Sequence, residues 1–218
     1  MSKSEIASSK ANEPRAEIAA AAVEALRRGE VIVFPTETLY GLGADALNSS
    51  AVEKVFELKG RDPANPIPVL VANRSMLESL VAEVPSLAEK LIARFWPGPL
   101  TIVLPACADI PRPLVNSRGC VGVRISSSPI ATDLVEKLGR PLTATSANPS
   151  GQPAARTVRE AKDYFAGKLE VFIDGGELKS KIGSTVIEIT KDSLAVIREG
   201  EISKAELERV IGKERIVR

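Results

Sequence analysis

Short runs of aliphatic and β-branched residues alternate with segments of helical character along most of this 218-residue chain. Such runs predict inner strands at 31–34, 69–71, 100–104 and 121–126. Between them, residues 16–28 and 50–58 predict helices, and Gly29 is suited to end the first of these. This alternation is typical of an α/β domain, so we expect helices that flank a sheet.

Hydroxyl residues with N-cap chemistry mark the starts of several helices. The spacing of a capping box predicts helix starts at Ser50, Ser86, Thr157 and Ser203. Ser128 followed by Pro129 predicts another start, since proline is favoured at the first helical position. The helix that begins at Ser86 is expected to run to Trp96, where Pro97-Gly98-Pro99 stops it.

The second half of the chain carries further strand signals. Residues 141–145 and 170–173 predict two strands, while 185–190 and 194–198 predict a hairpin around Lys191-Asp192-Ser193. A hairpin pairs its strands antiparallel, so the sheet is expected to contain strands of mixed direction. The sequence shows no internal repeat and no low-complexity tract.

Length and composition set the broad class of the protein. A chain of this length suits one large domain, and 44% hydrophobic residues can build a proper core. We expect a flexible tail over residues 1–14 and a single catalytic domain over 15–218. The net charge of +1 gives no global signal for nucleic acid or membrane binding. The polar start and the lack of a long apolar run predict a cytoplasmic protein.

The residues that are missing or scarce exclude several chemistries. The chain contains no histidine, which excludes catalysis by Ser-His or Cys-His pairs. Two cysteines, Cys107 and Cys120, are too few for a four-ligand zinc site, and no disulfide framework is visible. The sequence therefore predicts no protein-bound metal, and a substrate that brings its own nucleophile.

Five polar clusters interrupt these apolar stretches, each near a strand end or just after a helix. They are Pro35 to Gly43, Lys59-Gly60-Arg61, Arg124, Ser146-Ala147-Asn148, and Gly183-Ser184-Thr185 with Arg198. In α/β proteins such positions gather the groups that contact ligands. The clusters offer cations, hydroxyls and an amide, which suits a site that holds phosphates and polarises oxygens.

Each cluster also has a plain structural interpretation. Lys59 could close a helix, with Gly60 at the left-handed position after it. Ser146-Ala147-Asn148 could form an Asx-type turn, and Arg198 could be a solvated edge residue. Arg124 could pair at the surface with Asp133 or Glu136 of the following helix.

Taken together, the clusters resemble the YrdC family, the threonylcarbamoyl-AMP synthases of tRNA modification. The resemblance covers about residues 15 to 200, and its marks are PTETLYGLG at 35–43, KGR at 59–61 with Asn65-Pro66, WPGPLT at 96–101, VGVR at 121–124, TSANPSG at 145–151, GSTV at 183–186 and IREG at 197–200. It implies a twisted mixed α/β sheet with a concave basic face. It also implies a reaction that joins L-threonine, bicarbonate and ATP into L-threonylcarbamoyl-AMP and releases pyrophosphate.

The resemblance further implies a role for each matching residue. Lys59 and Arg61 correspond to a catalytic, phosphate-gripping pair. The remaining ATP contacts correspond to Asn65, Ser146, Asn148 and Arg198, and the contacts to L-threonine correspond to Thr36 or Thr38, Arg124 and Ser184. Mg²⁺ is expected to accompany ATP. A downstream complex is expected to transfer the threonylcarbamoyl group to adenosine 37 of tRNA.

Some features depart from the family pattern or leave rivals open. Some relatives carry histidine where this chain has Leu70, so a contact to L-threonine there must be apolar or absent. Because the chain ends at Arg218, it resembles the short form of the synthases. One rival is a carbamoyltransferase domain that handles carbamoyl-adenylate. The other is a non-catalytic RNA-binding module. The low aromatic content of 4% does not favour this alternative, because such modules often stack bases on aromatic side chains, but weak tRNA binding stays open.

Overall fold

A computed structural model describes residues 14–190 and 192–217. Residues 1–13 of the predicted tail lie outside the described residues, and Pro14 is the first residue of a helix. The helices are α1 (Pro14–Arg27), α2 (Ser49–Lys59), α3 (Arg74–Glu78), α4 (Ser86–Phe95), α5 (Pro129–Leu138), α6 (Val158–Phe165) and α7 (Lys204–Ile211), with 3-10 turns η1 (Arg112–Leu114) and η2 (Lys213–Arg215).

Two sheets form the centre of the molecule, and their strand directions are mixed as predicted. The larger has the order β10 (Ile216–Val217), β9 (Ser193–Arg198), β8 (Thr185–Thr190), β4 (Leu100–Pro105), β5 (Cys120–Arg124), β3 (Val69–Leu70) and β6 (Leu142–Thr143). The smaller has the order β1 (Ile32–Pro35), β2 (Tyr40–Gly43) and β7 (Thr145–Ser146). β4 pairs parallel with β8 and antiparallel with β5.

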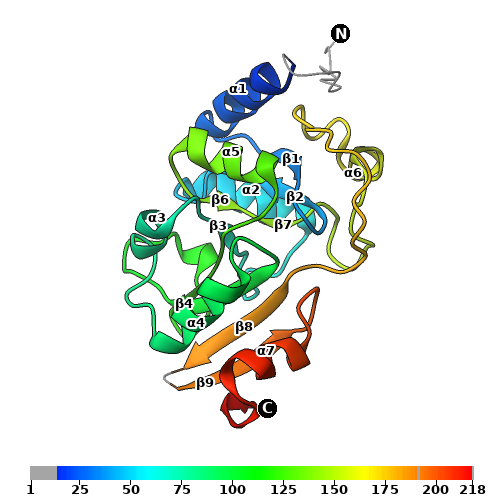
Figure 1. Cartoon of the computed structure of the whole chain (residues 1–218). Helices are drawn as coiled ribbons and strands as arrows, with labels where there is room; N and C mark the ends of the chain where they lie inside the picture. Colours follow the sequence, from blue (N-terminus) through cyan, green and yellow to red (C-terminus); the bar gives the residue numbers. More distant parts are fainter. Residues whose placement is uncertain (1–13, 191, 218) are drawn as a thin grey trace.

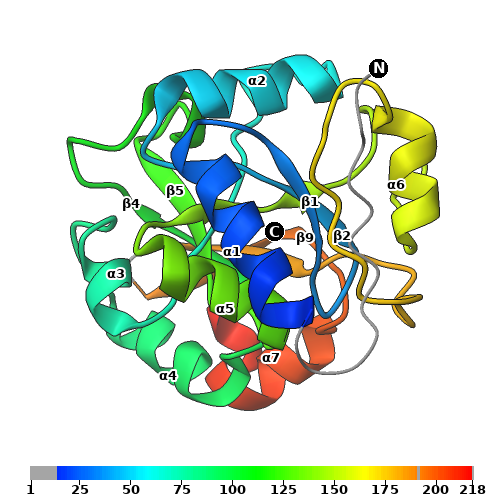
Figure 2. The ribbon, with the colours of Figure 1, turned by 90° about the horizontal axis from the view of Figure 1, so that it is seen from above.

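Helices cover both sheets from several sides. Helices α1 and α5 pack together next to β1, at the top of Figure 1, and they lie side by side in front in Figure 2. Their buried side chains, such as Leu26 and Leu134, share an apolar cluster with Phe34. A larger cluster fills the space under α2, α4 and α7, and α4 packs against α7. Within the described residues, no helix is long and apolar enough to cross a membrane.

Most of the predicted helix boundaries are confirmed, but two caps are wrong. Thr157 and Ser203 form complete capping boxes, and Ser128 caps α5 ahead of Pro129. The cap of α2 is not Ser50 but Asn48, whose side chain accepts a hydrogen bond from the backbone N–H of Ala51. In α4, Ser86 is already the first helical residue, and no side chain caps it.

Three strand predictions need correction. Residues 40–43, which belong to the polar cluster Pro35 to Gly43 and were not predicted to be a strand, form β2 and pair antiparallel with β1. The predicted strand 141–145 is divided between β6 and β7, which belong to different sheets. Residues 170–173 make only an isolated bridge, in which Phe172 pairs with Val33. The predicted hairpin is confirmed as β8 and β9, although Lys191 lies outside the described residues.

Candidate active site

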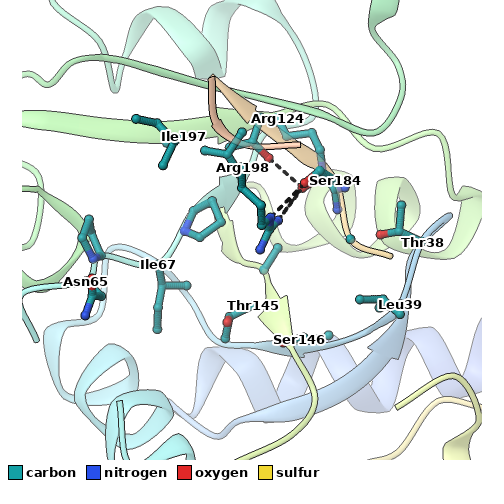
Figure 3. A pocket seen from close by; sticks show the side chains of 18 of the residues that line it. Thr38, Leu39, Asn65, Ile67, Arg124, Thr145, Ser146, Ser184, Ile197 and Arg198 are labelled. Carbon is teal, nitrogen blue, oxygen red and sulfur yellow. Dashed lines mark hydrogen bonds between the residues drawn. The ribbon is translucent and has the colours of Figure 1, made fainter. Parts of the chain in front are cut away.

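A cavity of about 620 Å³ lies between the larger sheet and the loops around it. One side, the strand wall, comprises Thr101 and Val103 of β4, Cys120, Gly122 and Arg124 of β5, Ser184 directly before β8, and Val186 and Glu188 of β8. The facing side, the loop wall, comprises Arg61, Asn65, Pro66, Ser146, Asn148 and Gln152. In Figure 3, Ser184 and Arg198 lie above the open space, with Thr145 and Ser146 below it.

Every predicted site residue except Lys59 lines this cavity. They reach it from elements that are distant in sequence, namely the β1–β2 hairpin loop, the segment after α2, the end of β5, β7 and its following turn, and the β8–β9 hairpin. Within the described residues, the charged side chains of the lining are basic apart from one carboxylate: Arg61, Arg118, Arg124, Lys181, Arg198 and Glu188. The cavity therefore has the electrostatic character of an anion site.

Arg124 is the most deeply buried of these cations, with only 5% of its surface exposed. It does not pair with Asp133 or Glu136 at the surface. Its Nη1 instead lies 3.5 Å from Oε1 of Glu37, and neither atom has a hydrogen-bond partner among the residues that the structure describes. Burial lowers the pKa of the Arg124 guanidinium, and the Glu37 carboxylate opposes this shift. The Arg124 side chain lines the cavity, and a planar guanidinium at such a place suits a carboxylate ligand.

Arg198 and Ser184 are held against each other across the β8–β9 hairpin. Arg198 donates from Nη2 to the backbone carbonyl of Ser184 at 2.8 Å and to its Oγ at 3.3 Å (Figure 3). The Ser184 hydroxyl also lies 3.1 Å from Oγ1 of Thr101. Loss of solvent lowers the pKa of Arg198, and the positive charges of Arg124 and Arg61 lower it further. Three guanidinium groups thus share one small volume, which favours a polyanionic ligand.

A β-bulge explains how two successive residues of β9 both reach the cavity. Val186 pairs with Arg198 and Ile187 pairs with Val196, which leaves Ile197 as the extra residue. In a regular strand, neighbouring side chains point to opposite faces, whereas here both Ile197 and Arg198 line the cavity. Bulges commonly redirect side chains next to functional sites.

The hairpin loop between β1 and β2 contributes two threonines of different character. The Thr36 hydroxyl donates to the Leu39 carbonyl at 2.7 Å and accepts from the backbone N–H groups of Thr38 and Leu39. Within residues 14–190 and 192–217, the Thr38 hydroxyl makes a single hydrogen bond, at 3.1 Å with the hydroxyl of Thr36. Thr36 therefore organises the turn, and Thr38 keeps hydrogen-bonding capacity for a ligand.

On the loop wall, Arg61 is fixed by backbone carbonyls. Its Nε donates to Asn65 at 2.7 Å and its Nη2 donates to Pro66 at 3.3 Å. Partial burial lowers the pKa of Arg61. These contacts use one edge of the guanidinium and leave its Nη1 available to an anion in the cavity.

Lys59 contacts backbone carbonyls of the loop wall, while the direct phosphate contact that the resemblance implies stays a prediction. Lys59 is 3% exposed, and its Nζ donates to the carbonyls of Ser146 at 2.6 Å and Asn148 at 2.8 Å. Burial, and then the charge of Arg61, lower the pKa of Lys59 to about 8. This buried ammonium joins the end of α2 to the turn after β7, and so it sets the shape of the loop wall.

Asn148 also holds this turn together. Its Nδ2 donates to the carbonyls of Pro149 at 2.9 Å and Gln152 at 2.7 Å, which confirms that the side chain stabilises a turn. Its Oδ1 is buried and has no hydrogen-bond partner within the described residues. Asn148 therefore serves the turn and still offers one acceptor to a ligand.

Two further positions sharpen the comparison with the sequence. Leu70 is 1% exposed and packs in the apolar cluster under α1 and α5, so it makes no wall of the cavity. The sequence analysis missed Glu188, which lies two strand steps from Ser184 and lines the cavity. The sequence did offer a signal, because Glu188 is four residues after Ser184, and residues an even number of positions apart in a strand point to the same face. Residues 14–190 and 192–217 contain no group of three or more metal-ligating side chains.

The structure combines an α/β sheet with a cavity whose charged lining is mostly basic in the described part of the chain. The family model described as Sua5_yciO_yrdC, Telomere recombination, matches residues 24–200. The chain belongs to this family, which confirms the resemblance inferred from its motifs.

Curated relatives place the chain more closely. It is 44% identical over 191 residues to a threonylcarbamoyl-AMP synthase of Pyrococcus abyssi, covering 88% of this chain and 56% of the relative. It is 40% identical over 202 residues to a Bacillus subtilis protein of the same name, covering 92% of this chain and 58% of the relative. The chain thus spans a little over half the length of these two relatives. A putative synthase of Mycobacterium tuberculosis is 35% identical, and the match covers 88% of both chains.

Solved structures agree with the fold. Pyrococcus abyssi Sua5 complexed with L-threonine superposes with a TM-score of 0.88 at 42% identity, covering 93% of this chain and 59% of that chain. Escherichia coli YciO superposes with a TM-score of 0.80 at 30% identity, covering 88% of this chain and 93% of that chain. Full-length HypF, at 20% identity and a TM-score of 0.71, shows only that the fold is shared.

Proposed function

We propose that the protein is an L-threonylcarbamoyl-AMP synthase, which converts L-threonine, bicarbonate and ATP into L-threonylcarbamoyl-AMP and pyrophosphate. The observation that carries this proposal is one cavity that combines the clustered guanidinium groups of Arg61 and Arg198 with the deeply buried guanidinium of Arg124. The relatives named threonylcarbamoyl-AMP synthase and the L-threonine complex of Sua5 support the same assignment.

The reaction requires the protein to position the substrates and to stabilise negative charge, and it requires no protein nucleophile. The unprotonated amine of L-threonine takes up the carbon of bicarbonate-derived carbon dioxide and becomes a carbamate. A carbamate oxygen then attacks the α-phosphorus of ATP, the bond to the β-phosphate oxygen breaks, and pyrophosphate leaves. Negative charge grows on the leaving group, where fixed cations stabilise it. Holding the reactants in place can contribute about 7–11 kcal/mol, so a chain without histidine can catalyse this step.

The roles we propose follow from the contacts of each side chain. Arg124 would hold the carboxylate of L-threonine through two parallel hydrogen bonds, with Ser184 and Thr38 as neighbouring hydroxyls. Arg61 and Arg198 would stabilise the phosphates, together with Asn65, Ser146 and Asn148 of the loop wall. Lys59 would keep that wall in shape, because it already binds two of its carbonyls.

Several further assignments belong to the same proposal. Mg²⁺ would enter with ATP and be held mainly by phosphate oxygens and water, as this ion usually is in ATP-dependent sites. We propose a cytoplasmic location and a nucleotidyltransferase class of reaction. The product would supply a downstream complex that transfers the threonylcarbamoyl group to tRNA.

A pyrophosphate-release assay tests this function. The purified protein with ATP and Mg²⁺ should release pyrophosphate only when L-threonine and bicarbonate are both present, and tRNA should not be required. The adenylate product should be identified by mass spectrometry. Turnover that needs carbamoyl phosphate and ignores L-threonine would support the carbamoyltransferase alternative. RNA binding without any pyrophosphate release would support the RNA-binding alternative.

A further inference from the structure

The proposed function gives no role to Glu37, although this residue lies in the β1–β2 hairpin loop between two residues that line the cavity. Thr36 and Thr38 belong to the lining, whereas Glu37 is not among the described lining residues. The Glu37 side chain is only 15% exposed, so its carboxylate is largely removed from solvent. A buried carboxylate is costly unless it is paired and hydrogen-bonded, and its partners therefore indicate what it does.

The first partner of Glu37 is Arg124. Glu37 Oε1 lies 3.5 Å from Nη1 of the buried Arg124 guanidinium. The positive charges of Arg124 and Arg61 lower the pKa of Arg198, which shows that these guanidinium groups repel one another. A buried arginine among like charges needs a fixed counterion, because repulsion would otherwise turn it away from the cavity. Glu37 supplies that counterion.

Glu37 is itself held by the segment that follows β5. The Ser126 hydroxyl donates a hydrogen bond to Glu37 Oε2 and accepts one from the backbone N–H of Ser128 at 3.1 Å. The Ser128 hydroxyl donates to the carbonyl of Pro35 at 3.1 Å, which returns the chain of contacts to the end of β1. Glu37 and Ser128 therefore join the hairpin loop to the segment after β5 at two points.

These contacts connect the two parts of the proposed L-threonine pocket. Thr38 reaches the pocket from the hairpin loop, and Arg124 reaches it from the end of β5. In Figure 3, Arg124, Ser184 and Thr38 lie along one side of the open space. A guanidinium has several N–H donors, so a contact from Nη1 to Glu37 leaves donors for two parallel hydrogen bonds to a second carboxylate.

We propose that Glu37 is a positioning residue for L-threonine, which holds the Arg124 guanidinium in the orientation that binds the substrate carboxylate. Glu37 does this from behind Arg124, without touching the substrate. The role rests on the proposed function, because the carboxylate of L-threonine is there the ligand of Arg124. The plain alternative is that Glu37 only stabilises the fold, in which case its loss would affect all substrates alike.

The test uses Glu37→Gln, because glutamine has nearly the same shape and its amide oxygen can still accept the hydrogen bond of Ser126. The KM for L-threonine should rise roughly tenfold, as is typical of residues coupled in one network, while kcat and the KM for ATP stay within about twofold of the wild type. Glu136→Gln is the matched control. Glu136 is exposed on α5 and does not line the cavity, so the same change of charge there should alter neither KM.

A double-mutant cycle with Arg124→Gln separates positioning from a structural role. Because Glu37 acts through Arg124, Glu37→Gln should have no further effect on the KM for L-threonine once the guanidinium is gone. Calorimetry with L-threonine and with its amide gives an independent measurement, since the amide lacks the carboxylate. The wild type should bind L-threonine more tightly than the amide, and Glu37→Gln should lower this preference by the same factor as it raises the KM.

Three results would overturn the role of Glu37. They are an unchanged KM for L-threonine in folded Glu37→Gln, a loss that persists in the Arg124→Gln background, and an equal loss of affinity for L-threonine and its amide. If Glu37→Gln does not fold, Ser126→Ala is the milder variant, because it removes only the donor that holds Glu37 Oε2. Ser126→Ala should raise the KM for L-threonine and not that for ATP, and no change would equally overturn the role.

Pyrophosphate release by the wild type tests the proposed function separately. L-threonine binding that depends on Glu37, in a protein that makes no threonylcarbamoyl-AMP, would disprove the proposed function and support the positioning role. A wild type that makes the product, with a KM for L-threonine that does not depend on Glu37, would do the reverse.

Discussion

The two walls of the cavity use their polar side chains differently. On the loop wall, Arg61 and Asn148 donate hydrogen bonds to backbone carbonyls of their own loops, and Lys59 at the end of α2 donates to the carbonyls of Ser146 and Asn148. On the strand wall, Arg124 Nη1 and Glu188 Oε1 are buried without hydrogen-bond partners among the described residues. Asn148 Oδ1 is the exception on the loop side.

The difference has a simple physical origin. Strand backbones satisfy their N–H and C=O groups in the sheet ladder, which leaves the side chains free to bind a ligand. Loop backbones lack a ladder, so nearby side chains must supply the missing donors. Substitutions on the loop wall should therefore reduce stability and activity together, whereas substitutions on the strand wall should act mainly on ligand binding.

The largest effect is expected for Arg61→Ala. Removing the guanidinium should lower threonylcarbamoyl-AMP formation by about 100-fold, which corresponds to about 2.7 kcal/mol of transition-state stabilisation. Because Arg61 also binds the carbonyls of Asn65 and Pro66, a modest loss of thermal stability should accompany the loss of activity. Pyrophosphate release and thermal unfolding measure the two effects.

Arg112→Ala is the matched control for this variant. Arg112 is exposed in η1 and does not line the cavity, so its replacement should leave both activity and stability near the wild-type values. An Arg61→Ala protein that is folded and fully active would remove Arg61 from the phosphate site.

The second effect concerns Lys59 and the pH dependence of stability. The pKa of Lys59 falls from 10.5 to about 8 in the folded protein, so between pH 8 and 10 the unfolded chain holds more protons than the folded one. The free energy of unfolding should therefore rise with pH over this window, by about 2 kcal/mol from this group. Urea unfolding at pH 8, 9 and 10 measures the rise.

Lys59→Met isolates this contribution. The variant should be less stable at every pH, because the carbonyls of Ser146 and Asn148 lose their buried donor. The free energy of unfolding of Lys59→Met should also lack the increase between pH 8 and 10 that Lys59 gives the wild type. Tyr40, whose pKa is raised from 10.0 to about 12 by burial, acts in the opposite direction, and most of its effect lies above pH 10. Identical pH profiles of stability in the wild type and in Lys59→Met would show that the pKa of Lys59 is not lowered in the folded protein.

The comparison of the walls also shows how far the sequence could predict the site. Nine of the predicted residues line the cavity, because polar residues at strand ends are visible in the sequence. The contact of Lys59 with the Ser146 carbonyl was not predicted, because the two residues are far apart in the chain. Glu188 and Ile197 were missed, since a bulge and the choice of strand face depend on the pairing of β8 with β9.

The same limit applies to the fold. Its local elements were predicted, but the pairing of strands that are distant in sequence was not. Runs of apolar residues and local caps identified the main helices and most strands. The assignment of β6 and β7 to different sheets, and the reduction of residues 170–173 to a single bridge, depend on partners elsewhere in the chain. Local sequence cannot supply that information.

The third effect, on the strand wall, should be selective for one substrate. Arg124→Lys should raise the KM for L-threonine by tenfold or more, about 1.4 kcal/mol, because an ammonium cannot form two parallel hydrogen bonds to a carboxylate. The KM for ATP and the thermal stability should change little. Steady-state kinetics with each substrate varied in turn measures this. Equal losses for both substrates would move Arg124 to the phosphates.

The smallest effect separates Thr38 from Thr36 within one hairpin loop. Thr38→Val should raise the KM for L-threonine several-fold, about 1 kcal/mol for one hydrogen bond, while the free energy of unfolding stays near the wild-type value. Thr36→Val should do the reverse, because the Thr36 hydroxyl bonds the backbone of Thr38 and Leu39 and a buried loop then loses its donor and acceptor. Kinetics and urea unfolding of both variants form the test. If Thr36→Val raised the KM while Thr38→Val only reduced stability, the assignments would have to be exchanged, and the turn would depend on Thr38 instead.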